Sequence, residues 1–177
     1  MVIFIIILVI VVFAFIVINN KIKQLGVKID EASSSIEIAL VKRYDVLQAS
    51  YDVVKGYIKH EDKIMTELIQ VRQGMTISEL GNAGLQQDKA ISNIFAVAEQ
   101  YPNLKANEMF SNLQRQLTEE NTHYASAKRV YNSNVSIYNQ CIVSFPNSIV
   151  AGMIGAKQKE FLKETDVDSK RDITFTF

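Results

Sequence analysis

The chain has 177 residues, enough for one domain together with a membrane anchor. Its 19 Lys and Arg balance its 19 Asp and Glu, and none of these lies in the apolar N-terminal run. The remaining, soluble part is therefore also neutral, which argues against a nucleic-acid partner because such binding needs clustered positive charge. The one cysteine, Cys141, cannot form an internal disulfide, so cysteine use indicates no oxidising compartment.

The first predicted element is a transmembrane helix over residues 1–18. These residues form an uninterrupted apolar run, and at ~1.5 Å per residue they reach roughly 27 Å, near one hydrocarbon thickness. A cleaved signal peptide is the competing interpretation, but no basic region precedes the run and no small-residue cleavage pattern follows it. Lys21, Lys23 and Lys28 follow the span, and positive flanks stay in the cytoplasm. We therefore expect a single-pass protein of the inner membrane whose soluble domain faces the cytoplasm.

The second predicted element is one long amphipathic helix over residues 20–73, with an apolar or aromatic residue at most third or fourth positions. Continuing straight out of the membrane, it would extend on the order of 80 Å beyond the bilayer. Gly26 and Gly56 weaken this helix by roughly 1 kcal/mol each relative to Ala, so either position can bend it. Three glycines between residues 74 and 84 then predict the main loop.

Three further helices are predicted, over residues 85–100, 104–144 and 147–163. The only two prolines lie in matching triplets, Tyr101-Pro102-Asn103 and Phe145-Pro146-Asn147. Proline disfavours helix in the residue before it, and the asparagine can cap the helix that follows. Short connections make consecutive helices neighbours. We expect an all-α fold: a transmembrane helix followed, over residues 19–163, by an antiparallel long-helix bundle of three main helices and a short fourth.

The C-terminal tail, residues 164–177, combines two patterns. Residues 164–172 are mostly polar and are typical of a tether. Ile173, Phe175 and Phe177 then alternate with polar residues, a pattern that can add to the sheet edge of a protein partner. Alternatively, the rings fold onto the bundle or onto a neighbouring copy. In both cases we expect the tail to be bound in the working protein.

Six short motifs follow one another along the chain. They are Lys42-Arg43-Tyr44-Asp45, Val54-Lys55-Gly56-Tyr57-Ile58-Lys59-His60-Glu61, Tyr101-Pro102-Asn103-Leu104-Lys105-Ala106-Asn107, Arg129-Val130-Tyr131-Asn132, Tyr138-Asn139 and Phe145-Pro146-Asn147. In this order they resemble the signature of the LemA family, and with the apolar span and tail the resemblance covers nearly the whole chain.

The resemblance implies a membrane-anchored antiparallel helical bundle with a very long first helix, and a family whose biochemical role is poorly defined. The chain departs from the family pattern at two places. Gln48 and Ala49 replace a common proline and asparagine, which would remove a kink. Ser33 replaces a common tryptophan, which would loosen packing near the membrane.

The adjacent His60 and Glu61 match the first two residues of the zinc-binding His-Glu-x-x-His pattern, but Ile64 occupies the position of the second histidine. The only other histidine is His123. A metal-dependent hydrolase using His60, Glu61 and His123 is therefore a remote alternative. The structural interpretation is a partly buried imidazole beside a solvated carboxylate.

The helix predicted over residues 104–144 carries two Tyr-Asn pairs seven residues apart, Tyr131-Asn132 and Tyr138-Asn139, which places both pairs on one face. They could line a polar groove for a ligand. Alternatively, the tyrosines bury their rings and the asparagines fix the register between helices, which is the interpretation we favour.

Arg43, beside Tyr44 and Asp45, could form an internal ion pair with a carboxylate such as Glu120, or a solvated pair worth under ~1 kcal/mol. Cys141 fits a small buried hydrophobe better than a nucleophile, because no histidine or aspartate lies within one helical turn of it.

The sequence contains no phosphate-binding glycine loop, no Gly-x-Ser-x-Gly elbow and no paired carboxylates, so we expect no catalytic residues, no cofactor and no metal. The expected function is a membrane-anchored scaffold that assembles with copies of itself or docks other proteins. A self-assembling protein that organises or shapes the membrane is the alternative. The candidate structural or interaction residues are Arg43, Tyr44, Asp45, Tyr57, His60, Glu61, Tyr131, Asn132, Tyr138, Asn139, Phe175 and Phe177.

Overall fold

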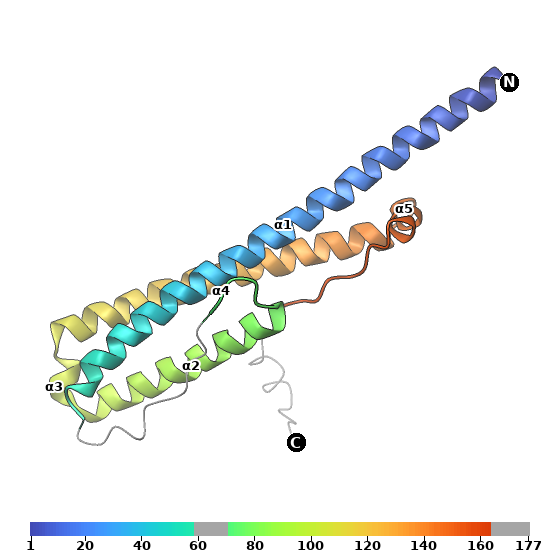
Figure 1. The fold of residues 1–177 in the computed structure, drawn as a ribbon. Helices are drawn as coiled ribbons and strands as arrows, with labels where there is room; N and C mark the ends of the chain where they lie inside the picture. Colours follow the sequence, from blue (N-terminus) through green and yellow to red (C-terminus); the bar gives the residue numbers. More distant parts are fainter. Residues whose placement is uncertain (59–70, 164–177) are drawn as a thin grey trace, which may run out of the picture. The chain divides into compact units, whose positions relative to one another are not determined.

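The computed structural model describes residues 1–58 and 71–163, and within these residues the regular structure is entirely helical (Figure 1). The all-α prediction and the long N-terminal apolar helix are confirmed. The predictions made for His60, Glu61, Phe175, Phe177 and the rest of the tail lie outside the described residues. The helices are α1 (Val2–Lys55), α2 (Ile77–Gln100), α3 (Pro102–Lys105), α4 (Glu108–Val143) and α5 (Asn147–Met153).

Helix α1 joins the apolar run and the amphipathic segment into one continuous helix, but it ends at Lys55. The predicted continuation of this helix to residue 73 is therefore wrong at residues 56–58 and 71–73. The backbone amides of Gly56 and Tyr57 bond to carbonyls three residues earlier, which tightens and closes the final turn. Gly26 does not interrupt the helix, and residues 48 and 49 are also helical.

Helix α2 begins at Ile77, so the loop predicted over residues 74–84 is wrong from residue 77 onward. A capping box explains the early start. The Glu79 amide donates to Thr76 Oγ1 at 3.3 Å, and the Thr76 amide donates to Glu79 Oε2 at 2.6 Å. These bonds satisfy amides that the first turn would otherwise leave free, and they stabilise a helix that carries two glycines, Gly81 and Gly84.

Each proline triplet lies at a helix junction, as predicted, but the caps differ from the prediction. Asn107 caps α4, because its Oδ1 accepts a bond from the Phe110 amide at 3.1 Å. Asn147 does not cap α5; its Nδ2 instead lies 3.4 Å from Cys141 Sγ. The helix predicted over residues 147–163 ends at Met153, and Gly155 follows with a positive φ of 69°. Such a left-handed residue is typical of a helix end.

The chain divides into two compact units. Unit 1 contains Met1–Ser34 and Arg129–Phe161, and unit 2 contains Ser35–Lys128 and Leu162–Phe177. Unit 2 is organised around one apolar cluster to which α1, α2, α3 and α4 all contribute. Its buried members are Leu47, Val54, Ala90, Ile91, Ile94, Ala98, Leu104, Phe110 and Leu117.

Contacts within unit 2 define the helix directions. Arg43 of α1 stacks on Tyr124, whereas Tyr57, just beyond α1, bonds to Asn107, just before α4; the two helices are therefore antiparallel. Helix α2 is also antiparallel to α4, because Gly84 touches Tyr124 while the short α3 joins the other ends. Consequently α1 and α2 run in the same direction, as Figure 1 shows. This order differs from the sequential antiparallel order that was predicted from short connections, because α1 ends at Lys55 and α2 begins only at Ile77.

Unit 1 pairs the first part of α1 with the end of α4. Asn134 Nδ2 donates to the Lys28 carbonyl at 3.0 Å, and Tyr131 lies close enough to Asp30 for that carboxylate to raise the pKa of the tyrosine. Residue numbers therefore rise on one helix as they fall on the other, so the two segments are antiparallel. After α5 the chain turns back along α4, and we call residues 157–161 the return segment.

Candidate functional site

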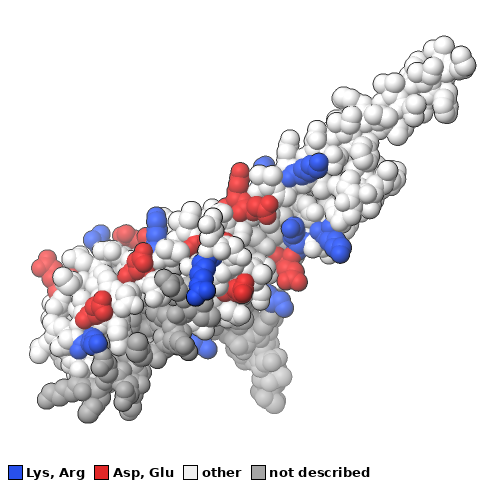
Figure 2. Space-filling view, in the orientation of Figure 1, with Lys and Arg blue, Asp and Glu red and all other residues white. Residues whose placement is uncertain are grey.

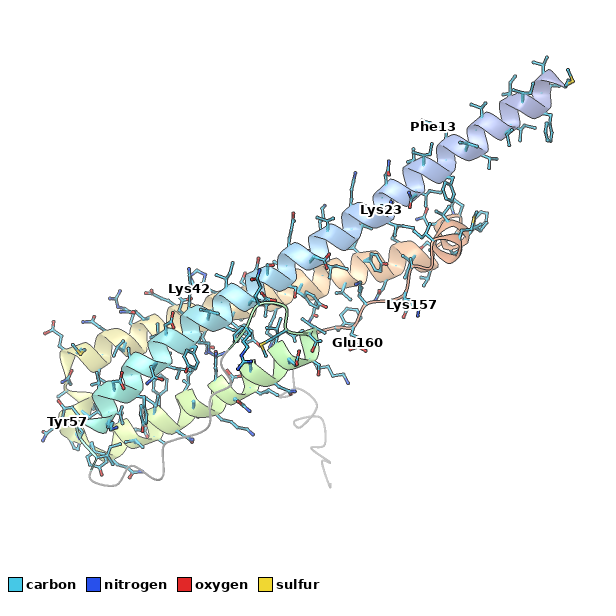
Figure 3. All side chains as sticks on the ribbon, in the orientation of Figure 1. Phe13, Lys23, Lys42, Tyr57, Lys157 and Glu160 are labelled. Carbon is cyan, nitrogen blue, oxygen red and sulfur yellow. The ribbon has the colours of Figure 1, made fainter. Side chains whose placement is uncertain are left out.

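The N-terminal part of α1 has the most distinctive surface in the molecule. Residues 1–14 are all exposed and, apart from the backbone amino group, uncharged. Figure 2 shows this end of α1 as a surface without Lys, Arg, Asp or Glu, and Phe13, labelled in Figure 3, is 68% exposed. An 18-residue window with mean hydropathy 3.5 makes α1 long and apolar enough to cross a membrane. Leaving this surface in water would cost roughly 25 cal/mol per Å².

A second feature is the buried Arg43 of unit 2. Its side chain is completely buried, and its Nη2 forms an ion pair with Asp88 Oδ1 on α2. Its guanidinium carbon lies 5.3 Å from the centroid of the Tyr124 ring, and Lys128 Nζ lies 5.3 Å from the same centroid. Three helices therefore meet at one fixed cation, because α1 supplies Arg43, α2 supplies Asp88 and α4 supplies Tyr124.

Gln87, next to Asp88, ties α2 to α1 a second time. It is fully buried, and its Nε2 donates to the Leu40 carbonyl at 3.0 Å. Four polar atoms in the described residues are buried without a hydrogen-bond partner: Arg43 Nε and Nη1, Gln87 Oε1 and Glu120 Oε2. A buried polar group without a partner costs stability, so this cluster specifies how the helices pair more than it stabilises them.

The cluster depends on a glycine. A Cβ at Gly84 would overlap the Tyr124 hydroxyl and come within 2.8 Å of its ring carbon Cζ. Gly84 therefore lets the hydroxyl end of Tyr124 approach α2 closely, while the ring of Tyr124 also contacts Arg43. This close approach is the structural reason for a glycine inside α2, which the sequence pattern had assigned to a loop.

The chemistry of this cluster is limited to fixed charge and hydrogen bonding. The guanidinium of Arg43 offers only N–H donors, so it can hold charge and donate hydrogen bonds. No group of three or more His, Cys, Asp or Glu able to hold a metal occurs among residues 1–58 and 71–163. The expectation that the chain has no catalytic activity remains a prediction, because His60 and Glu61 lie outside those ranges.

A third feature is the contact between α4 and the return segment in unit 1, on which Figure 3 labels Lys157 and Glu160. Asn139 makes a two-way pair with Lys159: its Nδ2 donates to the Lys159 carbonyl, and its Oδ1 accepts from the Lys159 amide, both at 2.9 Å. The Tyr131 hydroxyl donates to the Glu160 carbonyl at 3.0 Å. An amide side chain thus substitutes for the backbone partner that an extended segment normally finds in a sheet.

The environment of the two buried tyrosines changes their acidity. Burial raises the pKa of Tyr131, and the carboxylates of Glu160 and Asp30 raise it further. Burial also raises the pKa of Tyr138, with a smaller contribution from Cys141. Both phenols are therefore neutral hydrogen-bonding groups, and the Tyr131 hydroxyl donates to the chain's own backbone.

The other predicted residues are separated in the fold. Tyr44 is partly buried and Asp45 is exposed, while Arg43 pairs with Asp88 and not with the suggested Glu120. The exposed Tyr57 accepts a bond from Asn107 Nδ2 at 2.8 Å. The structure thus assigns the four candidates of this group to α1 and the turn after it.

Two further placements concern α4. Asn132 is partly buried, and Cys141 is buried, as predicted for a small hydrophobe. Sequence reasoning missed three residues of α2 that contact α1 or α4: Gln87, Asp88 and Gly84. The helical pattern of α2 was visible in the sequence from residue 85 onward. Because residues 74–84 were assigned to a loop, the first turns of α2 and the close approach at Gly84 were not predicted.

Comparison with known proteins agrees with the motifs. The model of the LemA family matches residues 32–177. Magnetosome protein MamQ 2 and Magnetosome protein MamQ 1 of Paramagnetospirillum magneticum (strain ATCC 700264 / AMB-1) are each 29% identical over 75 residues. Each match covers 42% of this chain and 28% of the relative, so this chain spans less than a third of their length. Because the family match covers most of the chain, this protein belongs to the LemA family.

Proposed function

We propose that this chain is a single-pass protein of the bacterial inner membrane whose helical bundle serves as a scaffold for other proteins on the cytoplasmic face, without catalytic activity. The observation that carries the proposal is the exposed, uncharged first part of α1, which continues without a break into the helix that enters unit 2. The anchor and the first helix of the bundle are therefore one continuous helix in the chain.

Orientation follows from charge. Lys21, Lys23 and Lys28 come directly after the apolar part of α1, and cationic flanks stay on the cytoplasmic side. A reporter active only in the cytoplasm should work when fused after Phe177, and one active only outside should fail. The opposite pattern would contradict the orientation. N-terminal sequencing of the membrane-bound protein separates an anchor, which is retained, from a cleaved signal peptide.

The scaffold role is supported by the kind of interior that unit 2 has. Its buried polar residues specify helix pairing, which a docking surface needs in order to keep a constant shape. The test is to purify the full chain in mild detergent and measure its mass by light scattering. Small species that carry stoichiometric partners fit a scaffold, and loss of those partners on deleting residues 173–177 would assign the docking segment to the tail. A preparation that never retains a partner would contradict the scaffold role.

A second candidate is a self-assembling protein that organises the membrane. It is favoured by exposed apolar residues on α4 in unit 1, Val130 and Ile137, which are seven residues apart and therefore share a face. Negative-stain images would then show rings or arrays. Small discrete species in the same preparation would exclude this alternative.

A further inference from the structure

Helix α5 and the turn before it display an apolar face that nothing in unit 1 covers. Phe145 is 82% exposed, Ile149 58% and Met153 71%. Ile149 and Met153 are four residues apart on α5, so they project from one side of this helix, and Phe145 lies exposed in the turn before it. The opposite side holds Val150 and Ala151, which are buried. The segment is thus amphipathic, and its apolar face is the outer one.

The sequence around this face lacks charge over an unusual length. Residues 130–156 contain no Asp, Glu, Lys, Arg or His, although the chain as a whole is 21% charged. In Figure 2 the surface near the N-terminal part of α1 is correspondingly free of colour. A surface helix of a soluble domain normally carries charges on its outer side, so this segment is adapted to a surrounding other than bulk water.

The register of unit 1 places α5 at the end of the proposed span. Asn134 bonds to the carbonyl of Lys28, and the two helices are antiparallel. The end of α4, Val143, lies nine residues beyond Asn134, about 14 Å at 1.5 Å per residue. The same distance along α1 from Lys28 leads to Asn19, the first residue after the apolar run.

Burial along α1 agrees with this position. Every side chain up to residue 14 is exposed, and the first partly buried ones are Phe15, Ile18 and Asn19. Figure 3 draws α5 level with the part of α1 between the labelled Phe13 and Lys23. The structure therefore sets α5 where α1 would leave the hydrocarbon.

We infer that Phe145, Ile149 and Met153 insert into the headgroup region of the same bilayer that α1 crosses, making α5 an interfacial second contact with lipid. This inference rests on the proposed function, because it requires α1 to be an anchor. Interfacial helices bury their apolar face roughly 5–10 Å deep, at the headgroup and acyl boundary. Lys21 and Lys23 on α1 and Lys157 after α5 supply cations for anionic headgroups.

A lipid surface suits this face better than a second copy of the chain does. Stable protein interfaces bury upward of roughly 1,000 Å² in total, whereas two side chains on a seven-residue helix and one in the turn before it offer a fraction of that. A bilayer needs no matching partner surface and is already present at this level. With α1 and α5 both held, the anchor resists tilting and rotation.

The test uses three matched substitutions in a chain that has no tryptophan of its own. Phe13→Trp, Phe145→Trp and Phe161→Trp each place one indole at an exposed phenylalanine of unit 1. Phe161 follows Glu160, which bonds to Tyr131 at the level of Asp30, eleven residues beyond Asn19 and so about 16 Å farther from the bilayer. The full-length variants are reconstituted in phosphatidylethanolamine–phosphatidylglycerol vesicles containing brominated lipids, and circular dichroism checks their folding.

We expect lipids brominated in mid-chain to quench the indole at position 13, lipids brominated close to the headgroup to quench the one at position 145, and neither lipid to quench the one at position 161. Met153→Trp reads the same face independently and should behave like Phe145→Trp. Quenching at 13 without quenching at 145 or 153 would leave the anchor intact and overturn the inference. Blue-shifted but unquenched emission at 145 would overturn it in favour of a protein contact. No quenching at 13 would remove the anchor, and with it both proposals.

Discussion

The two units of this chain differ in the polar interactions found inside each of them. Unit 2 has a continuous apolar cluster, and its buried charge is an arginine shared by three helices. Unit 1 also buries apolar side chains, among them Val135 and Ile142, and its polar side chains bond to backbone carbonyls and amides, through Asn134, Asn139 and Tyr131. The ion pair of unit 2 ties three helices to one another, whereas the bonds of Asn139 and Tyr131 hold the return segment against α4. The two units thus share apolar packing and differ in the polar interactions that accompany it.

The largest effect should come from emptying the unit 2 core. Phe110→Ala removes a fully buried ring and should lower the free energy of unfolding by about 3–5 kcal/mol. The neighbouring Met109, an exposed residue, provides the matched control, and Met109→Ala should change it by no more than about 0.5 kcal/mol. Denaturant titration of the full chain in detergent, followed by circular dichroism, measures both. Equal losses at 109 and 110 would mean that the register of α4 differs from the one described.

The buried ion pair should contribute more than a surface pair. Asp88→Ala leaves the guanidinium of Arg43 buried without its carboxylate and should cost on the order of 2 kcal/mol, less than a fully buried pair because Asp88 is 54% exposed. The exposed pair between Arg115 and Glu119, 3.7 Å apart, provides the control. Glu119→Ala should cost under ~0.5 kcal/mol. A similar small loss for Asp88→Ala would show that Arg43 is compensated elsewhere.

Replacing two glycines with alanine should change the free energy of unfolding in opposite directions. Gly84→Ala places a methyl group against the Tyr124 ring and should destabilise unit 2 by ~1–3 kcal/mol through overpacking. Gly26→Ala in unit 1 meets nothing within 4 Å and should stabilise its helix by roughly 0.5–1 kcal/mol. Thermal unfolding of both variants provides the comparison. Stabilisation by Gly84→Ala would show that Tyr124 does not need this close approach.

The contact between Asn139 and the Lys159 backbone in unit 1 should contribute less to stability than the interactions of unit 2 above, and its loss should have a local effect. Asn139→Ala removes both bonds to Lys159 and should cost about 1 kcal/mol, because water replaces most of what is lost at this exposed site. Amide hydrogen exchange should speed up at Lys159 and leave the unit 2 core protected. Gln140→Ala, at the exposed neighbour, is the control and should leave the Lys159 amide unchanged. Faster exchange throughout unit 2 would mean that the two units are not independent.

The smallest effect concerns the start of α2. The bonds from the Thr76 hydroxyl and amide hold the pKa of Glu79 below its usual 4.5. A lowered pKa in the folded state contributes stability above the unfolded pKa and loses it as pH falls through the folded pKa. The difference in melting temperature between the unmodified chain and Glu79→Gln should therefore be present at neutral pH and disappear below pH 4.5. A difference that does not change with pH would mean that the carboxylate is not the group that matters.

The sequence predicted the helical class and the proline junctions because these depend on local chemistry. Proline restricts the residue before it wherever it occurs, and the apolar period of α4 is visible without knowing its partner. Helix ends were less predictable. Gly56 ended α1 whereas Gly26, Gly81 and Gly84 did not, since a glycine inside a helix costs only about 1 kcal/mol, which packing or a cap can offset.

The candidate residues were likewise predicted from the sequence only in part. The sequence marked Arg43, Tyr131 and Asn139 as candidates, but it suggested the wrong carboxylate, Glu120, for Arg43 and no specific partner for the other two. Their partners are Asp88, the Glu160 carbonyl and the Lys159 backbone. Two of these three are backbone groups, which every residue has, so no pattern of side chains could have marked them.

By itself, then, the sequence determined the apolar run of α1, the helical periodicity, the neutral charge balance and the motifs of the family, because each is a property of neighbouring residues. The tertiary structure decided that α1 and α2 run in parallel, that Gly84 admits Tyr124, and that the end of α4, within the uncharged residues 130–156, lies at the level of the first residue after the apolar run. These depend on which distant segments meet. That choice is made by burial and hydrogen bonding across the whole fold, to which each short segment contributes only a small part of the free energy.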